Sequence, residues 1–450
     1  MDKKIYIKTF GCQMNAYDSK RMQDALGVLG YQPTEDKHEA DIILLNTCHI
    51  REKAADKLYS EIGRLAEIKQ VRKEQGKECL MIVTGCVVQA EGEELLARAH
   101  AVDIAVGPQN YHKLPELVAH FNRKKGRVLK ADFPAESKFD YLPQTNNSSA
   151  SAFLAIQEGC DKFCSYCVVP YTRGCEYSRS VNEILNEARH LVDGGAKEIM
   201  LLGQNVNCWH GLNDKGQEAD LGDLIRAVAK IDGLERIRYT TSYPSKMTDN
   251  LISAHGEVEK LMPYIHLPVQ AGSNKVLKAM NRQYTAEEYL DIVARFRKVR
   301  PDIAISSDFI VGFPGETDED FNQTMELVRQ VNYATAYSFK FSARPGTPAS
   351  LMKNQVPEAV KTERLAQLQD LLMSQMKTFN QKTVGQDTSI LITEQDVKRG
   401  QMLGYTPYLQ PVHVSNDNTL FGQIIPVKIT NATASSLTGE IKYDILNENH

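Results

Sequence analysis

The sequence predicts an α/β protein with three parts: an N-terminal parallel α/β domain, a central partial (β/α)6 barrel, and a small C-terminal β-barrel of oligonucleotide-binding type. Short apolar runs alternate with amphipathic stretches over residues 3–120 and again over 153–345, a pattern typical of βαβ units and a parallel sheet. The last 65 or so residues change to short β-rich runs between turn formers, which favours a small barrel. We expect domains at 1–120, 151–378 and 379–446, with a linker at 121–150.

The N-terminal part contains four apolar runs that read as strands, each followed by a helical stretch. The strand runs are "KIYIKTF", "ADIILLNTC", "CLMIVTGC" and "VDIAVG", and the helical stretches are "AYDSKRMQDALGVLG", "EKAADKLYSEIGRLAEI", "AEGEELLARA" and "YHKLPELVAHF". Cys12, Cys48 and Cys86 each follow a strand directly. Because the carboxyl ends of parallel strands line one crevice, we expect these thiols to converge. The alternative is that they are small buried residues, as we expect for Cys79.

The central part begins after a polar stretch, "PAESKFDYLPQTNNSSAS", that lacks periodicity. Its six strand candidates are "FLAIQE", "EIMLLGQ", "RIRYTTS", "YIHLPVQ", "IAISSDFIVGF" and "TAYSFKF". Six such βα units indicate a barrel with its chemistry at the carboxyl ends of the strands. An amphipathic helix is expected over 356–382. The C-terminal β runs are "TSILITE", "PVHVS", "LFGQIIPVKITNAT" and "LTGEIKY".

Composition excludes several classes of protein. The 450 residues are 42% hydrophobic with a formal net charge of -4, which argues against wholesale non-specific nucleic-acid binding but allows one basic face. No leader peptide and no apolar stretch of roughly 18 residues is visible, so we expect a cytoplasmic protein with no membrane contact. Nine cysteines in a reducing compartment favour metal or cluster ligands over disulfides.

The stretch "GCDKFCSYCVVPYTRG" holds Cys160, Cys164 and Cys167 within eight residues. A four-iron cluster needs four external ligands, so three thiolates leave one iron open. An open position distinguishes a catalytic metal site from a closed structural one. The missing ligand is therefore best explained as a substrate or cofactor. A zinc site that recruits a distant histidine or cysteine is the alternative.

This loop resembles the cluster loop of the radical S-adenosylmethionine enzymes. Further motifs resemble the methylthiotransferase family, and "TFGCQMN" with "NTCHIREKA" resembles its MiaB-type branch, which acts on N6-isopentenyladenosine in tRNA. The other motifs are "VTGCVVQ", "LLGQNVN", "HLPVQAGSNKVLKAMNRQYT" and "DFIVGFPGET". Seven motifs in the same order cover nearly the whole chain.

The resemblance implies two 4Fe-4S clusters, one on Cys12, Cys48 and Cys86 and one on Cys160, Cys164 and Cys167. It implies two molecules of S-adenosylmethionine per turnover, one that methylates a sulfur and one that yields the radical that abstracts hydrogen from C2 of the adenine at position 37. The partners it implies are the tRNA anticodon stem-loop, an electron-donor protein and a sulfur donor. Nothing in the sequence requires an oligomeric state larger than a monomer.

Six further residues are expected to bind the cofactor. Tyr166 lies where the superfamily contacts adenine, and Gln204 and Asn205 end the second barrel strand. The other three are Gln270 on the fourth strand, Asp308 on the fifth, and Arg173, which is expected to pair with a carboxylate or phosphate group. Gly312 and Gly315 are expected to let the backbone approach adenine. The alternative for each polar residue is a strand-end side chain that caps a turn or helix, and for Arg173, Arg179 and Arg282 a solvated surface charge. For His266, a structural role on its strand is favoured over a role as a ligand.

Three basic runs are candidates for RNA contact: "RIRYTTSYPSK", "ARFRKVRP" and "FNRKKGRVLK". The C-terminal barrel resembles the TRAM domain, with which the family binds tRNA. Two other functions stay open. One is methylthiolation of threonylcarbamoyladenosine in tRNA or of a ribosomal-protein aspartate, and the other is a non-catalytic iron–sulfur module that binds RNA or carries electrons.

Overall fold

The computed structural model describes residues 3–49, 54–145, 149–213, 215–396 and 400–443. The chain divides into two compact units. The first contains Met1–Asn146, Glu158–Asp161 and Cys167–Glu176, and the second contains Asn147–Gln157, Lys162–Tyr166 and Tyr177–His450.

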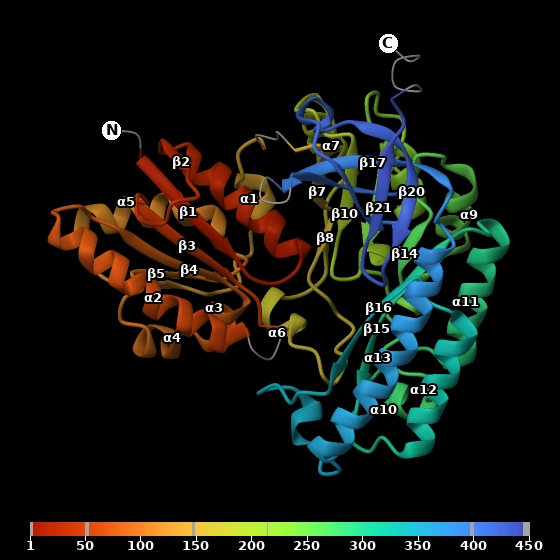
Figure 1. The fold of residues 1–450 in the computed structure, drawn as a ribbon. Coiled ribbons are helices and arrows are strands. Elements are labelled where there is room, and N and C mark those ends of the chain that lie inside the picture. The colour runs from red at the N-terminus through yellow and green to blue at the C-terminus, as the bar shows by residue number, and fades with distance from the viewer. Residues whose placement is uncertain (1–2, 50–53, 146–148, 214, 397–399, 444–450) are drawn as a thin grey trace. The chain divides into compact units, whose positions relative to one another are not determined.

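The first unit is built on a six-stranded parallel sheet with strand order β2-β1-β3-β4-β5-β6 (Figure 1). Its strands are β1 (Lys3–Thr9), β2 (Tyr31–Pro33), β3 (Ile42–Thr47), β4 (Leu80–Gly85), β5 (Ile104–Val106) and β6 (Val128–Lys130). Its helices are α1 (Gln13–Gly27), α2 (Ala54–Glu74), α3 (Cys86–Glu91), α4 (Glu93–Arg98), α5 (Leu114–Lys124) and α6 (Val169–Arg173).

Helices cover both faces of this sheet, so the first unit has three layers. On one face, α2, α3 and α4 pack on the side chains of Ile43, Leu45 and Val83. On the other face, α1 and α5 pack on Leu44 and Ile82. Burial on both faces explains why β3 and β4 read as continuous apolar runs rather than as alternating ones.

The second unit contains the six predicted barrel strands in two parallel sheets, β7-β10-β13 and β14-β15-β16. A single bridge, Ile237 to Leu261, joins β13 to the segment before β14. The strands are β7 (Ser151–Ala155), β10 (Glu198–Leu202), β13 (Arg236–Thr240), β14 (Tyr264–His266), β15 (Ala304–Val311) and β16 (Thr335–Lys340), with short strands β8 (Gln157–Glu158), β9 (Tyr177–Ser178), β11 (His210–Leu212) and β12 (Glu218–Asp220). The helices are α7 (Val181–Asp193), α8 (Leu221–Val228), α9 (Asp249–Glu257), α10 (Asn274–Ala279), α11 (Ala286–Val299), α12 (Asp318–Val331) and α13 (Glu358–Gln381).

The outer face of β14-β15-β16 is covered by α11, α12 and α13 (Figure 1). On β15, Phe309 and Val311 are buried toward these helices, and the Phe309 ring contacts Tyr333, which follows α12. Because side chains alternate along a strand, Asp308 and Ile310 lie on the opposite face, which these helices leave uncovered. The parallel barrel predicted from the apolar alternation is confirmed.

The second unit ends in a closed five-stranded barrel with order β17-β18-β19-β21-β20, as predicted. The strands are β17 (Asp387–Asp396), β18 (Gln401–Tyr405), β19 (Pro411–Ser415), β20 (Ile424–Ala432) and β21 (Leu437–Ile441). Its core consists of apolar side chains such as Ile390, Val412 and Val427.

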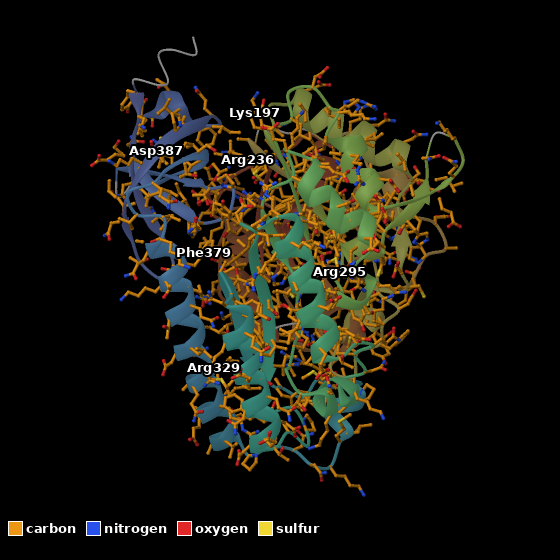
Figure 2. All side chains as sticks on the ribbon, turned by 90° about the vertical axis from the view of Figure 1, so that its right-hand side faces the viewer. Lys197, Arg236, Arg295, Arg329, Phe379 and Asp387 are labelled. Atoms are coloured by element: carbon orange, nitrogen blue, oxygen red, sulfur yellow. The ribbon has the colours of Figure 1, made fainter. Side chains whose placement is uncertain are left out.

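Two buried arginines of β13 tie this small barrel to the strands of the large one. Arg236 donates to the carbonyls of Tyr405 (2.8 Å) and Ser389 (3.1 Å). Arg238, 1% exposed, donates to Glu198 on β10 and to the carbonyl of Thr406, each at 2.8 Å. Figure 2 shows Arg236 where these strands meet the small barrel. The prediction that the run "RIRYTTSYPSK" offers its arginines to RNA is therefore wrong for both, because their donors are used inside the unit.

Six short strands, β2, β6, β9, β11, β12 and β18, are absent from the prediction, and β6 falls within the expected linker. The helix expected over "AEGEELLARA" is divided into α3 and α4 by Gly92, whose φ is +54°. Parts of three predictions lie outside the described residues: the start of the second helix at 52–53, linker residues 146–148, and the end of the C-terminal domain at 444–446.

Candidate functional site

Cys12, Cys48 and Cys86 follow three neighbouring strands of the first sheet. Cys12 caps the N-terminus of α1 after β1, Cys48 follows β3, and Cys86 begins α3 after β4. These strands are adjacent in the order β1-β3-β4 and parallel. The strand order thus brings the three cysteines to one edge of the sheet, although 74 positions separate the first from the last. Cys48 and Cys86 are buried and Cys12 is partly exposed.

Two glycines make this close arrangement sterically possible. A Cβ at Gly11 would lie 2.5 Å from the Cβ of Cys48, and one at Gly85 would lie 2.3 Å from the carbonyl oxygen of Thr47. Both glycines also have positive φ, +119° and +99°, a conformation that other residues rarely adopt. The residues just before Cys12 and Cys86 must therefore be glycine for the neighbouring strand ends to approach.

The donor set at this edge fits an iron–sulfur cluster better than a single ion. The three candidate ligands are all thiols, the ligand type that clusters use. Among the described residues, no three His, Cys, Asp or Glu side chains stand close enough to hold one metal ion. Each cysteine of a four-iron cluster binds a different iron, so its ligands need more space between them than those of a zinc ion.

The second set of cysteines lies in the loop between β8 and α6. Cys160 and Cys164 are buried and Cys167 is partly exposed. The backbone N–H of Cys160 donates to the carbonyl of Gly174 (3.1 Å), and that of Val169 donates to Cys167 Sγ (3.5 Å). Gly159, with φ +77°, lies so close to Cys175 that a Cβ would approach its carbonyl oxygen to 1.8 Å. The loop is thus held at both ends by backbone contacts within the first unit.

A half-buried arginine lies against Cys164 in the second unit. Arg282 Nη1 is 3.4 Å from Cys164 Sγ, and Nη2 donates to the carbonyl of Pro268 (3.0 Å). The guanidinium also lies over the rings of Tyr243 and Tyr284, 4.4 and 5.0 Å from their centroids. Burial lowers the pKa of Arg282, but the nearby Tyr284, Tyr166 and Cys164 raise it further, to well above its ordinary value. Arg282 is therefore a half-buried cation held beside this loop by contacts of its own, and not a freely solvated surface charge.

The predicted cofactor residues at the second barrel strand lie around Gln157. Asn205 is buried and Gln204 half-buried after β10. The backbone N–H of Asn205 donates to Gln157 Oε1 (3.1 Å). Gly203 permits this contact, because a Cβ there would lie 2.6 Å from the same oxygen. Gln157 was not among the predicted residues, although its place at the end of the expected first barrel strand, "FLAIQE", was a signal that could have identified it.

Gln270 and Asp308 lie side by side at the fourth and fifth strands. Gln270 has φ +75° and donates its N–H to the carbonyl of Asp308 (2.9 Å), while Ile310 donates to the carbonyl of Gln270 (2.9 Å). Asp308 Oδ2 lies 3.5 Å from Nε2 of His266, and His266 Nδ1 lies 3.0 Å from Ser306 Oγ. A non-glycine residue with positive φ is costly, and such residues cluster at functional sites.

Two exposed aromatic side chains, missed in the sequence, share the uncovered face with Asp308. Tyr337 and Phe339 on β16 are 54% and 47% exposed. In the strand register Tyr337 lies opposite Asp308 and Phe339 opposite Ile310, and the His266 ring meets that of Tyr337 edge-on at 6.3 Å. Aromatic side chains on a barrel strand normally serve the core, so their exposure here marks a surface for a planar ligand.

Other predicted residues have contacts of their own. Arg173 ends α6 and pairs with Asp18 (2.7 Å) and Glu158 (2.6 Å), and Arg179 pairs with Glu187 (2.7 Å). Gly312, with φ +71°, makes its closest approach to the Lys361 side chain.

The other two basic runs also make internal contacts. Arg127 donates to three carbonyls around the end of α4, and Arg300 pairs with Asp302 (3.0 Å). Arg295, labelled in Figure 2, pairs with Asp249. Within the described part of the chain, no helix is both long enough and apolar enough to cross a bilayer.

Three family descriptions match successive parts of the chain. Residues 4–107 match "Uncharacterized protein family UPF0004", residues 154–328 match the radical SAM superfamily, and residues 381–442 match the TRAM domain.

Solved structures of radical S-adenosylmethionine enzymes share the fold. The methyltransferase TsrM from Kitasatospora setae, solved with cobalamin and a [4Fe-4S] cluster, aligns with a TM-score of 0.58 at 13% identity over 78% of this chain and 77% of its own. The cobalamin-dependent enzyme OxsB, solved with aqua-cobalamin and S-adenosylmethionine, aligns with a TM-score of 0.54 at 13% identity over 83% of this chain and 56% of its own.

The curated relatives are similar over their whole length. Proteins named tRNA-2-methylthio-N(6)-dimethylallyladenosine synthase from Rickettsia bellii and Rickettsia canadensis are each 55% identical to this chain, and the one from Rickettsia rickettsii is 54% identical. In each case the match covers 98% of this chain and 100% of the relative. With 55% identity over its full length, this chain belongs to the family of tRNA-2-methylthio-N(6)-dimethylallyladenosine synthases.

Proposed function

We propose that this protein adds a methylthio group to C2 of N6-isopentenyladenosine (N6-dimethylallyladenosine) at position 37 of tRNA, next to the anticodon. The observation that carries this proposal is the 55% identity to synthases of that name over 98% of the chain. The three domain types and the cysteines at the edge of the first sheet agree with it. Methylthiolation of threonylcarbamoyladenosine or of a ribosomal-protein aspartate is not favoured.

The two sets of cysteines are proposed to hold two 4Fe-4S clusters, one on Cys12, Cys48 and Cys86 and one on Cys160, Cys164 and Cys167. When bound, the second cluster and S-adenosylmethionine supply the radical chemistry that an unreactive aromatic C–H bond requires. Two molecules of S-adenosylmethionine are proposed to be used per turnover. The half-buried Arg282 would balance the negative charge that collects at the buried Cys164, since an isolated charge is costly in a buried site.

Polar groups at the carboxyl ends of the barrel strands are proposed to orient S-adenosylmethionine. Tyr166, Gln204 and Asn205 would bind its adenine and methionyl groups, with Gln157 fixing the backbone of Asn205 (3.1 Å). Gln270 would take part from the fourth strand, where its positive φ fixes its backbone beside Asp308. For Arg173, the two carboxylates that already bind its guanidinium favour a different role from cofactor binding.

The adenine of the tRNA is proposed to stack on Tyr337 and Phe339. Proteins read single-stranded RNA by splaying bases onto aromatic side chains and bonding their edges, and an enzyme that modifies a base must take it out of the stack. The carboxylate of Asp308, opposite Tyr337 in the register, can accept a hydrogen bond from the N6–H of the base. The apolar side chain of Ile310, opposite Phe339, would contact the isopentenyl group.

The C-terminal barrel is proposed to bind the anticodon stem-loop. It is the third of the three predicted domains, 1–120, 151–378 and 379–446. Its match to the TRAM domain supports this role. We further propose that the protein acts in the cytoplasm as a monomer, with a protein electron donor and a separate sulfur donor.

The test is anaerobic reconstitution followed by product analysis. Purified protein with dithionite, sulfide and S-adenosylmethionine is incubated with an anticodon stem-loop that carries N6-isopentenyladenosine, and digested nucleosides are analysed by mass spectrometry. We expect a product heavier by one methylthio group in place of hydrogen. Stem-loops with threonylcarbamoyladenosine or unmodified adenosine serve as controls, and faster turnover of either would overturn the assigned substrate.

A further inference from the structure

Four charged side chains form a buried cluster in the first unit. Arg173 pairs with Asp18 on α1 (2.7 Å) and with Glu158 (2.6 Å), and Lys138 pairs with the same two carboxylates at 3.6 and 2.8 Å. All four side chains are at most 4% exposed. Two cations and two anions balance formally, so the cluster can exist in a buried site.

Arg173 is the member of this cluster that faces the cysteines of the first sheet. Its Nη2 donates to Asn15 Oδ1 (3.1 Å), and Cys12 Sγ lies 3.8 Å from the same oxygen. The amide of Asn15 donates in turn to the carbonyls of Phe10 and Thr47, both at 2.9 Å. One asparagine therefore connects the guanidinium to Cys12 and to the residue before Cys48.

Two further observations place Arg173 beside Cys86. It ends α6, and α6 packs on α3, which begins at Cys86. Burial lowers the pKa of Arg173, but the electrostatic influence of Asp18, Cys86, Glu158 and Cys12 together raises it to well above its ordinary value. The guanidinium is thus within electrostatic reach of two of the three thiols.

Lys138 occupies the other side of the cluster. Its ammonium donates to the carbonyl of Pro108 (3.1 Å) and lies 4.5 Å from the centroid of the Tyr111 ring. The two cations share their carboxylates but differ in what else they touch, which makes Lys138 a matched control for Arg173.

We propose that Arg173 is a positioning residue that sets the reduction potential of the group held by Cys12, Cys48 and Cys86. Three thiolates make such a group anionic, and an added electron increases the negative charge. A fixed cation nearby stabilises the reduced form more than the oxidised form, and burial strengthens the effect because solvent does not screen it. This inference rests on the proposed function, since it requires a cluster at these three cysteines.

The experiment uses the full chain with Cys160→Ala, Cys164→Ala and Cys167→Ala, so that only the N-terminal cluster remains. After anaerobic reconstitution, the reduced cluster is followed by electron paramagnetic resonance during a potentiometric titration. Arg173→Met is expected to lower the reduced-to-oxidised ratio at a fixed potential at least tenfold, which is about 59 mV for a one-electron couple. Arg173→Lys, which keeps the charge, should recover most of this change, and Lys138→Met should alter the ratio less than threefold.

Equal shifts of the potential in Arg173→Met and Lys138→Met would overturn the proposal, because the effect would then come from the charge cluster as a whole. No shift in either variant would also overturn it, because Arg173 would then not affect the potential. If Arg173→Met does not fold, Arg173→Met with Asp18→Asn is compared with Lys138→Met with Asp18→Asn, since each double variant removes one charge of each sign. A lower reduced-to-oxidised ratio is expected in the variant that lacks Arg173, and equal ratios would overturn the proposal. Iron and sulfide counts separate this failure from that of the proposed function. If the chain with the three cysteine substitutions binds no iron, the assigned ligands themselves are refuted. If it binds iron but Arg173→Met leaves the reduction potential unchanged, only the role of Arg173 is refuted.

Discussion

Arg238 should contribute strongly to the stability of the second unit, and its replacement by methionine tests how the small barrel is attached. The guanidinium makes three hydrogen bonds of 2.8 Å, to Glu198, to the carbonyl of Pro407 and to that of Thr406. Methionine preserves the apolar stem but leaves Glu198, among the residues that the structure describes, with only the Ser151 hydroxyl (3.0 Å) as a side-chain hydrogen-bond donor. Loss of one partner of a buried pair costs about 3–5 kcal/mol.

The expected change is large enough to read from a urea titration. With a denaturant slope of about 3 kcal/mol/M, a loss of about 4 kcal/mol lowers the unfolding midpoint by about 1.3 M. Trp209 is the only tryptophan of the chain, is 1% exposed and lies in the same unit, so its fluorescence reports this transition. Because the chain has more than one unit, the midpoint is a safer measure than an extrapolated free energy.

A surface arginine of the same unit provides the control. Arg295 is labelled in Figure 2. Arg295→Met removes its pairs with Asp249 and Asp291, and we expect the free energy of unfolding to change by no more than about 0.5 kcal/mol. The double variant Glu198→Gln with Arg238→Met should recover part of the loss, because no buried carboxylate is then left without its partner. If Arg238→Met shifts the midpoint no more than Arg295→Met does, the attachment described here is wrong.

Three more outcomes are expected. Burial lowers the pKa of His255 to about 3, so at acidic pH the unfolded chain binds a proton that the folded chain does not. The free energy of unfolding should therefore fall by about 1.4 kcal/mol per pH unit as the pH drops below about 6.5. His255→Gln should flatten this part of the stability–pH curve relative to the parent protein. Burial raises the pKa of the Cys79 thiol to about 11, whereas Cys175 is exposed, so peptide mapping after brief alkylation of the metal-free protein at pH 8 should find Cys175 modified and Cys79 protected until denaturant is added. Tyr337→Ala and Phe339→Ala should each weaken binding of the anticodon stem-loop by about 1–3 kcal/mol, measured by fluorescence anisotropy. Tyr141→Ala is the control, because Tyr141 is another exposed aromatic residue and lies in the first unit; equal losses in all three variants would count against the stacking surface.

The periodicity of the sequence was enough to predict the strands that are long and buried. β3 and β4 each begin with a continuous apolar run because helices cover both faces of the sheet. The glycines and cysteines at the carboxyl ends of such parallel strands lie at one edge of the sheet. The strands that escaped prediction have only two to five residues each; they are β2, β6, β9, β11, β12 and β18. Such short strands carry too little periodicity to be distinguished from loops.

The role of individual charges could not be predicted from local sequence. "RIRYTTSYPSK" reads as a basic surface run, yet Arg238 is buried because its partners, Glu198 and the carbonyls at 406 and 407, come from distant segments. Lys138, within an expected linker, is likewise buried by Asp18 and Glu158. A charge run records composition, whereas burial depends on contacts formed only by the complete fold.

The two sets of cysteines differ in how far their members are spread along the chain, and this has a consequence for how the protein matures. Cys160, Cys164 and Cys167 lie within eight residues, so an unfolded chain or a short nascent segment can already present all three to iron. Cys12, Cys48 and Cys86 meet only when β1, β3 and β4 have paired. A ligand that binds the folded state alone stabilises it by its full binding energy, whereas one that also binds the unfolded state stabilises it less. A cluster on the proposed ligands Cys12, Cys48 and Cys86 would therefore stabilise the completed first sheet, and loss of the sheet would release its iron to a chelator.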